Sequence, residues 1–280
     1  MLLALDVGNT ETVVGLYQEP TGEISSHRRA GFAMGEQSSH GFFHRWRLST
    51  DVARTPDEHA VNLTQLLALE GLDIVETVTG IVISSSAPQV TGDLRAMAAR
   101  WFTDIPLVVL GPGIKSGMAI LYDNPREVGA DRIADAVGAH DLFGGPTIVV
   151  DLGTATTFDA INDKGEYLGG AIVPGVAISL DALFTQAAAL RSVELLEPRS
   201  VIGRSTVESI QSGVLYGYAA QVDGMCERFE RELGTATVVA TGGLSSLIAP
   251  HTSRVQHVEP WLTLHGLRLI YERNAAGTRA

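Results

Sequence analysis

Two short segments in opposite halves of the chain share a pattern of a carboxylate, a glycine and hydroxyl or amide side chains. The first is Asp6-Val7-Gly8-Asn9-Thr10, and the second is Asp151-Leu152-Gly153-Thr154. Each lies between two runs of strand-forming residues, which predicts a β-hairpin with Asp at the end of its first strand. The glycine lets backbone N–H groups approach an anion, and the carboxylate can hold a hydrated metal ion. Two such hairpins facing each other would clamp phosphate and metal.

The segments around the first hairpin predict the elements that must position it. Apolar runs bounded by turn residues predict strands over 2–6, 12–17, 45–50, 80–84 and 106–110, with helices over 55–71 and 91–101. Thr55, Pro56 and Glu58 have the spacing of a capping box with proline at the first helical position. We therefore expect the first helix to begin there.

The second half repeats this order. A helix is predicted over 130–143, then strands over 147–151, 156–161, 167–173, 237–241 and 255–258, helices over 176–190, 206–233 and 260–275, and a short helix after Gly243. The repetition indicates an internal duplication and two α/β domains with mixed sheets. The Gly- and Pro-rich stretch 111–125 is the expected linker, so we divide the chain into residues 1–116 and 117–280.

Composition narrows the classes of partner. The 280-residue chain has a net charge of -12 and only two lysines, Lys115 and Lys164, so we expect no nucleic-acid partner and no anionic membrane surface. No apolar run reaches transmembrane length. Cys226 is the single cysteine, which excludes an intrachain disulfide and fits a reducing compartment. We expect a cytoplasmic protein with Cys226 as a small apolar helix residue.

Several common catalytic motifs are absent. Ile114 stands where a Walker A motif needs glycine before Lys115, and no His-Glu-x-x-His, Cys-x-x-Cys or Gly-x-Ser-x-Gly sequence occurs. These absences argue against P-loop kinases, zinc hydrolases and α/β-hydrolases. Asp131 lies in the first turn of the helix predicted over 130–143, where the helix dipole favours its ionised form. From the pattern alone, an ordinary stabilising carboxylate is the better interpretation of Asp131.

Taken together and in order, the motifs resemble those of one family. The duplicated hairpins resemble the superfamily of actin, the heat-shock chaperone ATPases and the sugar kinases, and within it the chain is similar to the type III pantothenate kinases. The motifs that carry this resemblance are Asp6–Thr10, Tyr122–Pro125, Gly129–Arg132, Asp151–Ala155, Gly169–Ile172, Pro174-Gly175, Gly203–Thr206 and Thr241–Gly243. The resemblance implies two duplicated ribonuclease-H-like domains with mixed sheets, the actin-like ATPase fold.

The resemblance also implies roles for individual residues. Asp6 would hold Mg²⁺ through water, and Asp131 would accept the proton of the substrate hydroxyl. Asp151 would help to hold a monovalent cation, K⁺ or NH₄⁺. The residues implied in binding ATP are Asp6, Val7, Gly8, Asn9, Thr10, Glu11, Thr12, Val13, Thr154, Gly242 and Gly243. Those implied in binding the substrate are Tyr122, Gly129, Ala130, Asp131, Arg132 and Thr206.

The activity implied is ATP-dependent phosphorylation of pantothenate to 4'-phosphopantothenate, the first step of coenzyme A biosynthesis, by a homodimer. The first half would then supply the phosphate hairpin, and the second the substrate, cation and adenosine elements. Another small-molecule kinase or a phosphatase of the superfamily, or a regulator that binds nucleotide without turnover, remain alternatives. The segment Pro20–Phe43 is longer than the hairpin connection expected in this family, and we expect an irregular surface loop there.

Overall fold

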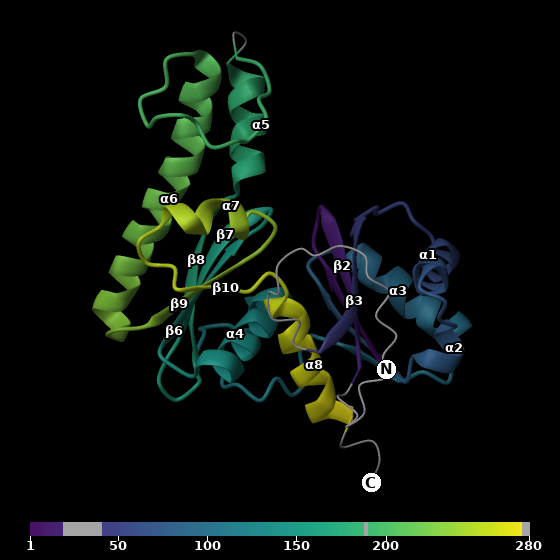
Figure 1. Cartoon of the computed structure of the whole chain (residues 1–280). Coiled ribbons are helices and arrows are strands. Elements are labelled where there is room, and N and C mark those ends of the chain that lie inside the picture. The colour runs from purple at the N-terminus through teal and green to yellow at the C-terminus, as the bar shows by residue number, and fades with distance from the viewer. Residues whose placement is uncertain (19–40, 188–189, 276–280) are drawn as a thin grey trace. The chain divides into compact units, whose positions relative to one another are not determined.

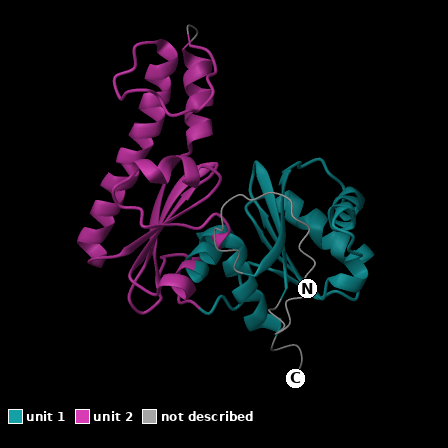
Figure 2. Ribbon diagram, viewed as in Figure 1, with its two compact units in different colours: residues 1–117, 126–138, 263–280 teal, residues 118–125, 139–262 magenta. Residues whose placement is uncertain are grey.

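The computed structural model describes residues 1–18, 41–187 and 190–275, and the chain divides into two compact units (Figure 2). Unit 1 comprises Met1–Gly117, Arg126–Gly138 and Thr263–Ala280, and unit 2 comprises Met118–Pro125 and Ala139–Leu262. The boundary predicted after residue 116 lies next to the end of the first segment of unit 1. The chain then returns to unit 1 twice, at Arg126–Gly138 and at Thr263–Ala280. Each unit is therefore made of separate segments, whereas the predicted division has two continuous halves.

Unit 1 is built on a five-stranded mixed sheet in the order β3-β2-β1-β4-β5. Figure 1 labels the neighbouring strands β2 and β3 of this sheet. Its strands are β1 (Leu2–Val7), β2 (Glu11–Tyr17), β3 (Phe42–Ser49), β4 (Gly80–Ser85) and β5 (Leu107–Val109). β1 pairs antiparallel with β2 and parallel with β4, so the end of β1 lies beside the end of β4.

Helices cover this sheet. They are α1 (Pro56–Leu69), α2 (Ile74–Thr77) and α3 (Pro88–Trp101), together with the first part of α4 (Ala130–Phe143) and nearly all of α8 (Leu262–Ala275). The predicted capping box is confirmed, because the Thr55 hydroxyl accepts from the Glu58 amide and the Glu58 carboxylate accepts from the Thr55 amide. α2 was not predicted; the Asp73 carboxylate caps this single turn.

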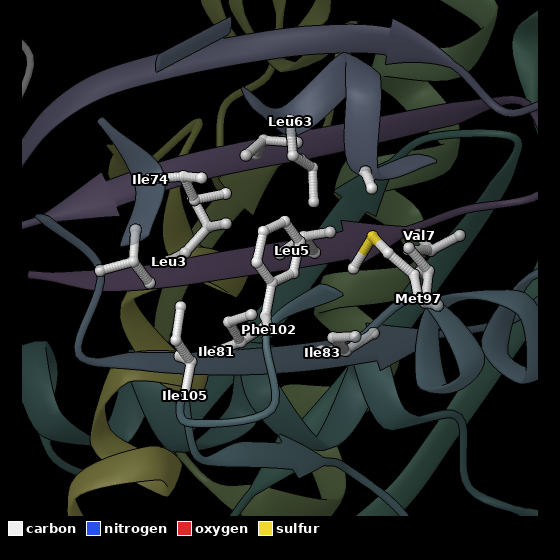
Figure 3. Packing of buried hydrophobic residues seen from close by; sticks show 14 of the residues in the cluster. Leu3, Leu5, Val7, Leu63, Ile74, Ile81, Ile83, Met97, Phe102 and Ile105 are labelled. Carbon is white, nitrogen blue, oxygen red and sulfur yellow. The ribbon is translucent and has the colours of Figure 1, made fainter. Parts of the chain in front are cut away.

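Alternation along β1 decides which side chains enter the core of unit 1. Leu3, Leu5 and Val7 point to the face packed against α1 and α3, where they meet residues such as Leu63 and Met97 (Figure 3). Successive side chains of a strand point to opposite faces. Asp6 therefore points away from this core, on the face of β1 opposite Leu5 and Val7.

Unit 2 repeats the sheet of unit 1 in the order β10-β9-β6-β7-β8. Its strands are β6 (Thr147–Leu152), β7 (Ala155–Ile161), β8 (Tyr167–Pro174), β9 (Thr237–Thr241) and β10 (His257–Val258). Its helices include α5 (Val176–Gln186), α6 (Thr206–Leu233) and α7 (Ser245–Ile248), with the 3₁₀ turn η2 (Ala249–His251). The 3₁₀ turn η1 (Pro125–Glu127) lies where the chain passes from unit 2 to unit 1. α5 and α6 lie side by side (Figure 1). The hydroxyl groups of Ser179 and Tyr218 form a hydrogen bond of 2.7 Å between them.

The two sheets match strand for strand. β6 pairs antiparallel with β7 and parallel with β9, as β1 does with β2 and β4. The predicted duplication and mixed sheets are confirmed. Cys226 is buried on α6 as expected, and burial raises the pKa of its thiol to about 12. In the part of the chain that the structure describes, no helix is long and apolar enough to cross a membrane.

Several predicted boundaries need correction, among them the start of α3, which lies at Pro88 rather than at the predicted residue 91. β3 begins at Phe42, inside the expected loop 20–43, because Phe42 is buried and packs edge-on against Tyr17 with ring centroids 5.6 Å apart. α5 ends at Gln186, short of the predicted Leu190. The strand predicted from Val255 shortens to His257–Val258. Residues 19–40, which contain most of the expected loop, lie outside the described residues.

Candidate active site

The end of β1 in unit 1 holds a carboxylate fixed by its neighbouring strand. Asp6 is paired in register with Ser84 of β4, and the fully buried Ser84 hydroxyl donates to Asp6 Oδ1 at 2.6 Å. Sequence analysis missed Ser84. The sequence does contain a signal that could have identified Ser84. The strand predicted over 80–84 ends on this serine, and the carboxyl ends of neighbouring parallel strands meet at the same edge of a sheet.

The surroundings of Asp6 change the pKa of its carboxyl group. Burial raises the pKa of this carboxyl from 3.8 to about 7, the Ser84 hydrogen bond opposes the rise, and the negative charge of Asp131 adds to it. Asp131 influences Asp6 although the two are far apart in sequence. The structure thus brings the predicted metal-binding and proton-accepting carboxylates together within unit 1.

This carboxylate pair fits a magnesium ion by its chemistry. Two like charges in a partly buried place repel each other, and a divalent cation would relieve that repulsion. Mg²⁺ usually binds through one or two carboxylates, retains water and takes further oxygens from substrate phosphates. Across the described ranges 1–18, 41–187 and 190–275, no group of three or more His, Cys, Asp or Glu side chains is arranged to hold a metal by itself. An ion beside Asp6 would therefore depend on water and phosphate.

The hairpin after Asp6 is closed tightly. The Gly8 amide donates to the Glu11 carbonyl at 2.9 Å, and a Cβ on Gly8 would lie 3.0 Å from that same oxygen. Asn9, Thr10 and Glu11 are exposed at the turn, whereas Val7 is buried in the core. The turn thus presents polar groups to solvent at the edge of the sheet where Asp6 lies.

Two other predicted ATP-binding residues, Thr12 and Val13, lie on β2, the second strand of the hairpin. The Thr12 hydroxyl is hydrogen-bonded to the Thr50 hydroxyl at 2.8 Å. Val13 is paired in register with Asp6 across the hairpin. Thr12 and Val13 therefore help to hold the shape of the hairpin.

Local backbone geometry aims Asp131. Its Oδ1 accepts from the Arg132 amide at 2.8 Å at the start of α4, and a Cβ on Gly129 would lie 2.4 Å from this Oδ1. Only glycine before Ala130 leaves room for the folded-back carboxylate. Arg132 is buried, with 8% of its surface exposed. Its guanidinium therefore does not take part in an ordinary ion pair at the protein surface.

Unit 2 places a second carboxylate at the matching strand end. Asp151 of β6 is in register with Thr157 and Thr241, and Gly242 follows directly after β9 with φ of 88°. A Cβ on Gly242 would lie 2.2 Å from Asp151 Oδ1, so a side chain there would fill the space beside this carboxylate. The structure brings the predicted Asp151 and Gly242 together, with Thr154 and Gly243 exposed nearby in sequence.

The remaining predicted residues of unit 2 lie on other elements. Tyr122 is partly buried and packs against Gly169 of β8. Thr206 is exposed at the start of α6, where Ser205 caps the helix by accepting from the Glu208 amide at 3.2 Å. Thr206 also lines a hollow of about 870 Å³ between α5 and α6, together with Arg204, Ser179 and Tyr218.

Comparisons with known proteins agree with the motifs. The profile of the type III pantothenate kinase family matches residues 2–228. A Type III pantothenate kinase from Streptomyces griseus subsp. griseus is 48% identical over 99% of this chain and 99% of its own. One from Anaeromyxobacter sp. is 50% identical, with 98% of this chain and 100% of its own covered.

A solved structure supports the fold independently. The activator of the 2-hydroxyisocaproyl-CoA dehydratase from Clostridium difficile, determined with bound ADPNP, matches with a TM-score of 0.55 and 11% identity. The match covers 100% of this chain and 97% of that one. Together with the duplicated sheets, this likeness confirms the predicted actin-like ATPase fold. The profile match over residues 2–228 and the relatives that cover nearly the whole sequence show that the chain belongs to the type III pantothenate kinase family.

Proposed function

We propose that this protein phosphorylates the primary hydroxyl of pantothenate with ATP, giving 4'-phosphopantothenate and ADP, the first step of coenzyme A biosynthesis. Family membership supports this activity. The observation that carries the proposal is that Asp131 lies near enough to Asp6 in unit 1 for its charge to raise the pKa of Asp6, because this phosphoryl transfer needs both a metal-holding carboxylate and an acceptor for the hydroxyl proton.

Each carboxylate has a separate task. Asp131, in the first turn of α4, accepts the proton as the hydroxyl oxygen bonds to the γ-phosphorus and the bond from that phosphorus to the ADP oxygen breaks. Asp6, oriented by Ser84, would hold Mg²⁺ through water, and the bound metal would supply neutralisation of the phosphate charge. The alcohol then attacks without having to carry a full negative charge.

The other predicted residues bind and orient the two substrates. The exposed turn residues Asn9 and Thr10 offer backbone N–H groups and polar side chains to the phosphates. Thr154, Gly242 and Gly243 are the further residues to which we assign ATP binding. Pantothenate is contacted by Tyr122, Gly129, Ala130, Arg132 and Thr206. A guanidinium such as that of Arg132 suits the pantothenate carboxylate because it can form two parallel hydrogen bonds.

We assign a monovalent cation, K⁺ or NH₄⁺, to Asp151. The space kept beside its carboxylate by Gly242 supports this assignment. Turnover measured in Tris buffer with KCl, NH₄Cl or NaCl at equal ionic strength tests it. Activity that is equal in all three salts would contradict a dedicated cation site.

A homodimer in the cytoplasm completes the proposal. Large apolar side chains are exposed on α5, on the start of α6 and on the segment between them, a pattern typical of an interface. They are Ile178, Leu183, Leu196, Val201, Ile202 and Val207. The single buried Cys226 suits a reducing compartment. Sedimentation equilibrium tests the dimer.

A substrate panel tests the activity itself. With ATP and Mg²⁺ present, kcat/KM for pantothenate is expected to exceed that for simple sugars by several orders of magnitude. A preferred sugar would favour another kinase of the superfamily, and ATP hydrolysis without an acceptor would favour a phosphatase. Tight nucleotide binding without any product would favour a regulator.

Ser84→Ala tests the orientation of Asp6. Loss of the hydroxyl removes the donor to Asp6 Oδ1 without adding bulk, and a hydrogen bond to a charged group contributes roughly 1.5–3 kcal/mol, so kcat/KM should fall about tenfold or more. Ser85→Ala is the matched control, since the Ser85 hydroxyl donates instead to the Ala87 carbonyl at 3.1 Å. Equal kinetics for both variants would show that Ser84 does not orient Asp6.

A further inference from the structure

Unit 2 contains a buried polar network that the activity described above does not use. Tyr167, at the start of β8, is fully buried, and its hydroxyl donates to Asp159 Oδ1 at 2.7 Å. Asp159 on β7 is also fully buried, and the Thr157 hydroxyl donates to its Oδ2 at 3.0 Å. A phenylalanine would fill nearly the same space, but it has no hydroxyl to donate to the Asp159 carboxylate. The hydroxyl and the carboxylate together therefore fix the direction of the Tyr167 ring more narrowly than apolar packing would.

The backbone of Tyr167 holds the segment that leads into Tyr122. Its amide donates to the Ala119 carbonyl at 2.9 Å, and its carbonyl accepts from the Leu121 amide at 2.8 Å. These two bonds form an isolated bridge outside the named strands. Residues Ala119 and Leu121 are thereby hydrogen-bonded to β8 at Tyr167.

A bulge in β8 lets Tyr122 approach the same place. Ala160 is opposite Gly169 and Ile161 is opposite Tyr167, so Leu168 is an extra residue. Gly169 has φ of 129°, and its absent Cβ would lie 3.4 Å from the Tyr122 ring. The centroids of the Tyr122 and Tyr167 rings are 6.4 Å apart, with the planes tilted by 49°. Bulges are frequent beside functional sites because they redirect side chains.

We propose that Tyr167, held by Asp159, is a positioning residue that fixes Tyr122 for pantothenate. The inference rests on the proposed function, in which Tyr122 contacts that substrate. Tyr167 reaches Tyr122 in two ways, through the backbone bridge and through ring contact, while its own ring is anchored by the buried carboxylate. Loss of the anchor should loosen Tyr122 and weaken pantothenate binding, with ATP binding and the chemical step preserved.

Tyr167→Phe tests this directly. We expect KM for pantothenate to rise about tenfold, while kcat and KM for ATP stay within about twofold of the wild type. Thr147→Val is the control, because it removes a different buried hydroxyl bond of unit 2, from Thr147 to the Gly144 carbonyl at 2.6 Å. A general loss of stability would act alike in both variants. Unchanged pantothenate KM in Tyr167→Phe, or an equal rise in both substrate KM values, would overturn the inference.

A double-mutant cycle shows whether Tyr167 acts through Tyr122. Tyr122→Leu removes the ring that is positioned, so Tyr167→Phe should add little to the pantothenate KM in that background. Full additivity of the two changes would overturn the inference.

Hydrogen exchange without ligand separates this inference from the proposed activity. The Leu121 amide, bonded to the Tyr167 carbonyl, should exchange several times faster in Tyr167→Phe than in the wild type. A wild-type protein that cannot phosphorylate pantothenate would refute the proposed function. Equal exchange at Leu121 in the two proteins would refute the positioning role in either case.

Discussion

Asp131→Asn is expected to lower kcat about a thousandfold, within the range of roughly 10²–10⁴ for loss of a general base. The amide has nearly the same shape, and its oxygen can still accept from the Arg132 amide, so α4 should keep its first turn. The variant cannot take the hydroxyl proton. Affinity for ATP, measured by calorimetry, should change only a few fold because the hairpin after Asp6 is untouched.

Two further measurements make this prediction specific. Asp141→Asn is the matched control: it removes an exposed carboxylate later in α4 and should retain wild-type kcat. Because the charge of Asp131 helps to raise the pKa of Asp6, Asp131→Asn should also move that pKa below about 7, which carboxyl NMR can follow. An intact Asp131→Asn protein with wild-type turnover would remove Asp131 from the proposed mechanism.

Asp6→Asn is expected to give a protein that is more stable than the wild type but nearly inactive. The pKa of Asp6 is raised from 3.8 to about 7, so between these values the folded protein holds a proton that the unfolded chain has lost. Stability from this group therefore falls as pH rises through that window and stays low above pH 7. Asparagine does not titrate, and its oxygen can still accept from Ser84.

Urea unfolding without Mg²⁺ measures the effect. At pH 8 the gain in free energy of unfolding should be on the order of 2 kcal/mol, and at pH 4 it should nearly vanish. Asp104→Asn, which makes the same charge change at an exposed site, should show no such pH-dependent gain. Turnover of Asp6→Asn should fall about a hundredfold or more, since the carboxylate that holds Mg²⁺ is lost. If the Asp6→Asn protein were no more stable than the wild type at pH 8, the claim that an ionised, partly buried Asp6 destabilises the fold would be contradicted.

Much of the fold could be predicted because its signals are local. The predicted bounds of α4 and α6, Ala130–Phe143 and Thr206–Leu233, agree with the structure. Both elements show helical spacing, and α6 has a Ser205 cap. The repeated Asp-x-Gly hairpins revealed the duplicated sheets because the same turn chemistry recurs at matching strand ends. A single capped turn such as α2 has too few residues to show a period.

The contacts within each site could not be predicted in the same way. Ser84 meets Asp6 because β1 and β4 adopt one parallel register, and shifting that register by one residue would turn the serine away. Gly242 approaches Asp151, and Tyr167 reaches Asp159, through pairings between strands rather than through neighbours in sequence. Sequence indicated the residue types and the strand ends, while the partners depend on tertiary register.

Phosphorus NMR of the complete reaction tests the central claim most directly. Purified protein, ATP, Mg²⁺, K⁺ and pantothenate are followed until ATP is consumed, with Asp131→Asn run in parallel. The account predicts one 4'-phosphopantothenate for each ADP with the wild type, and almost no conversion with the variant. ATP consumption that yields inorganic phosphate instead, or equal phosphopantothenate formation by both proteins, would contradict it.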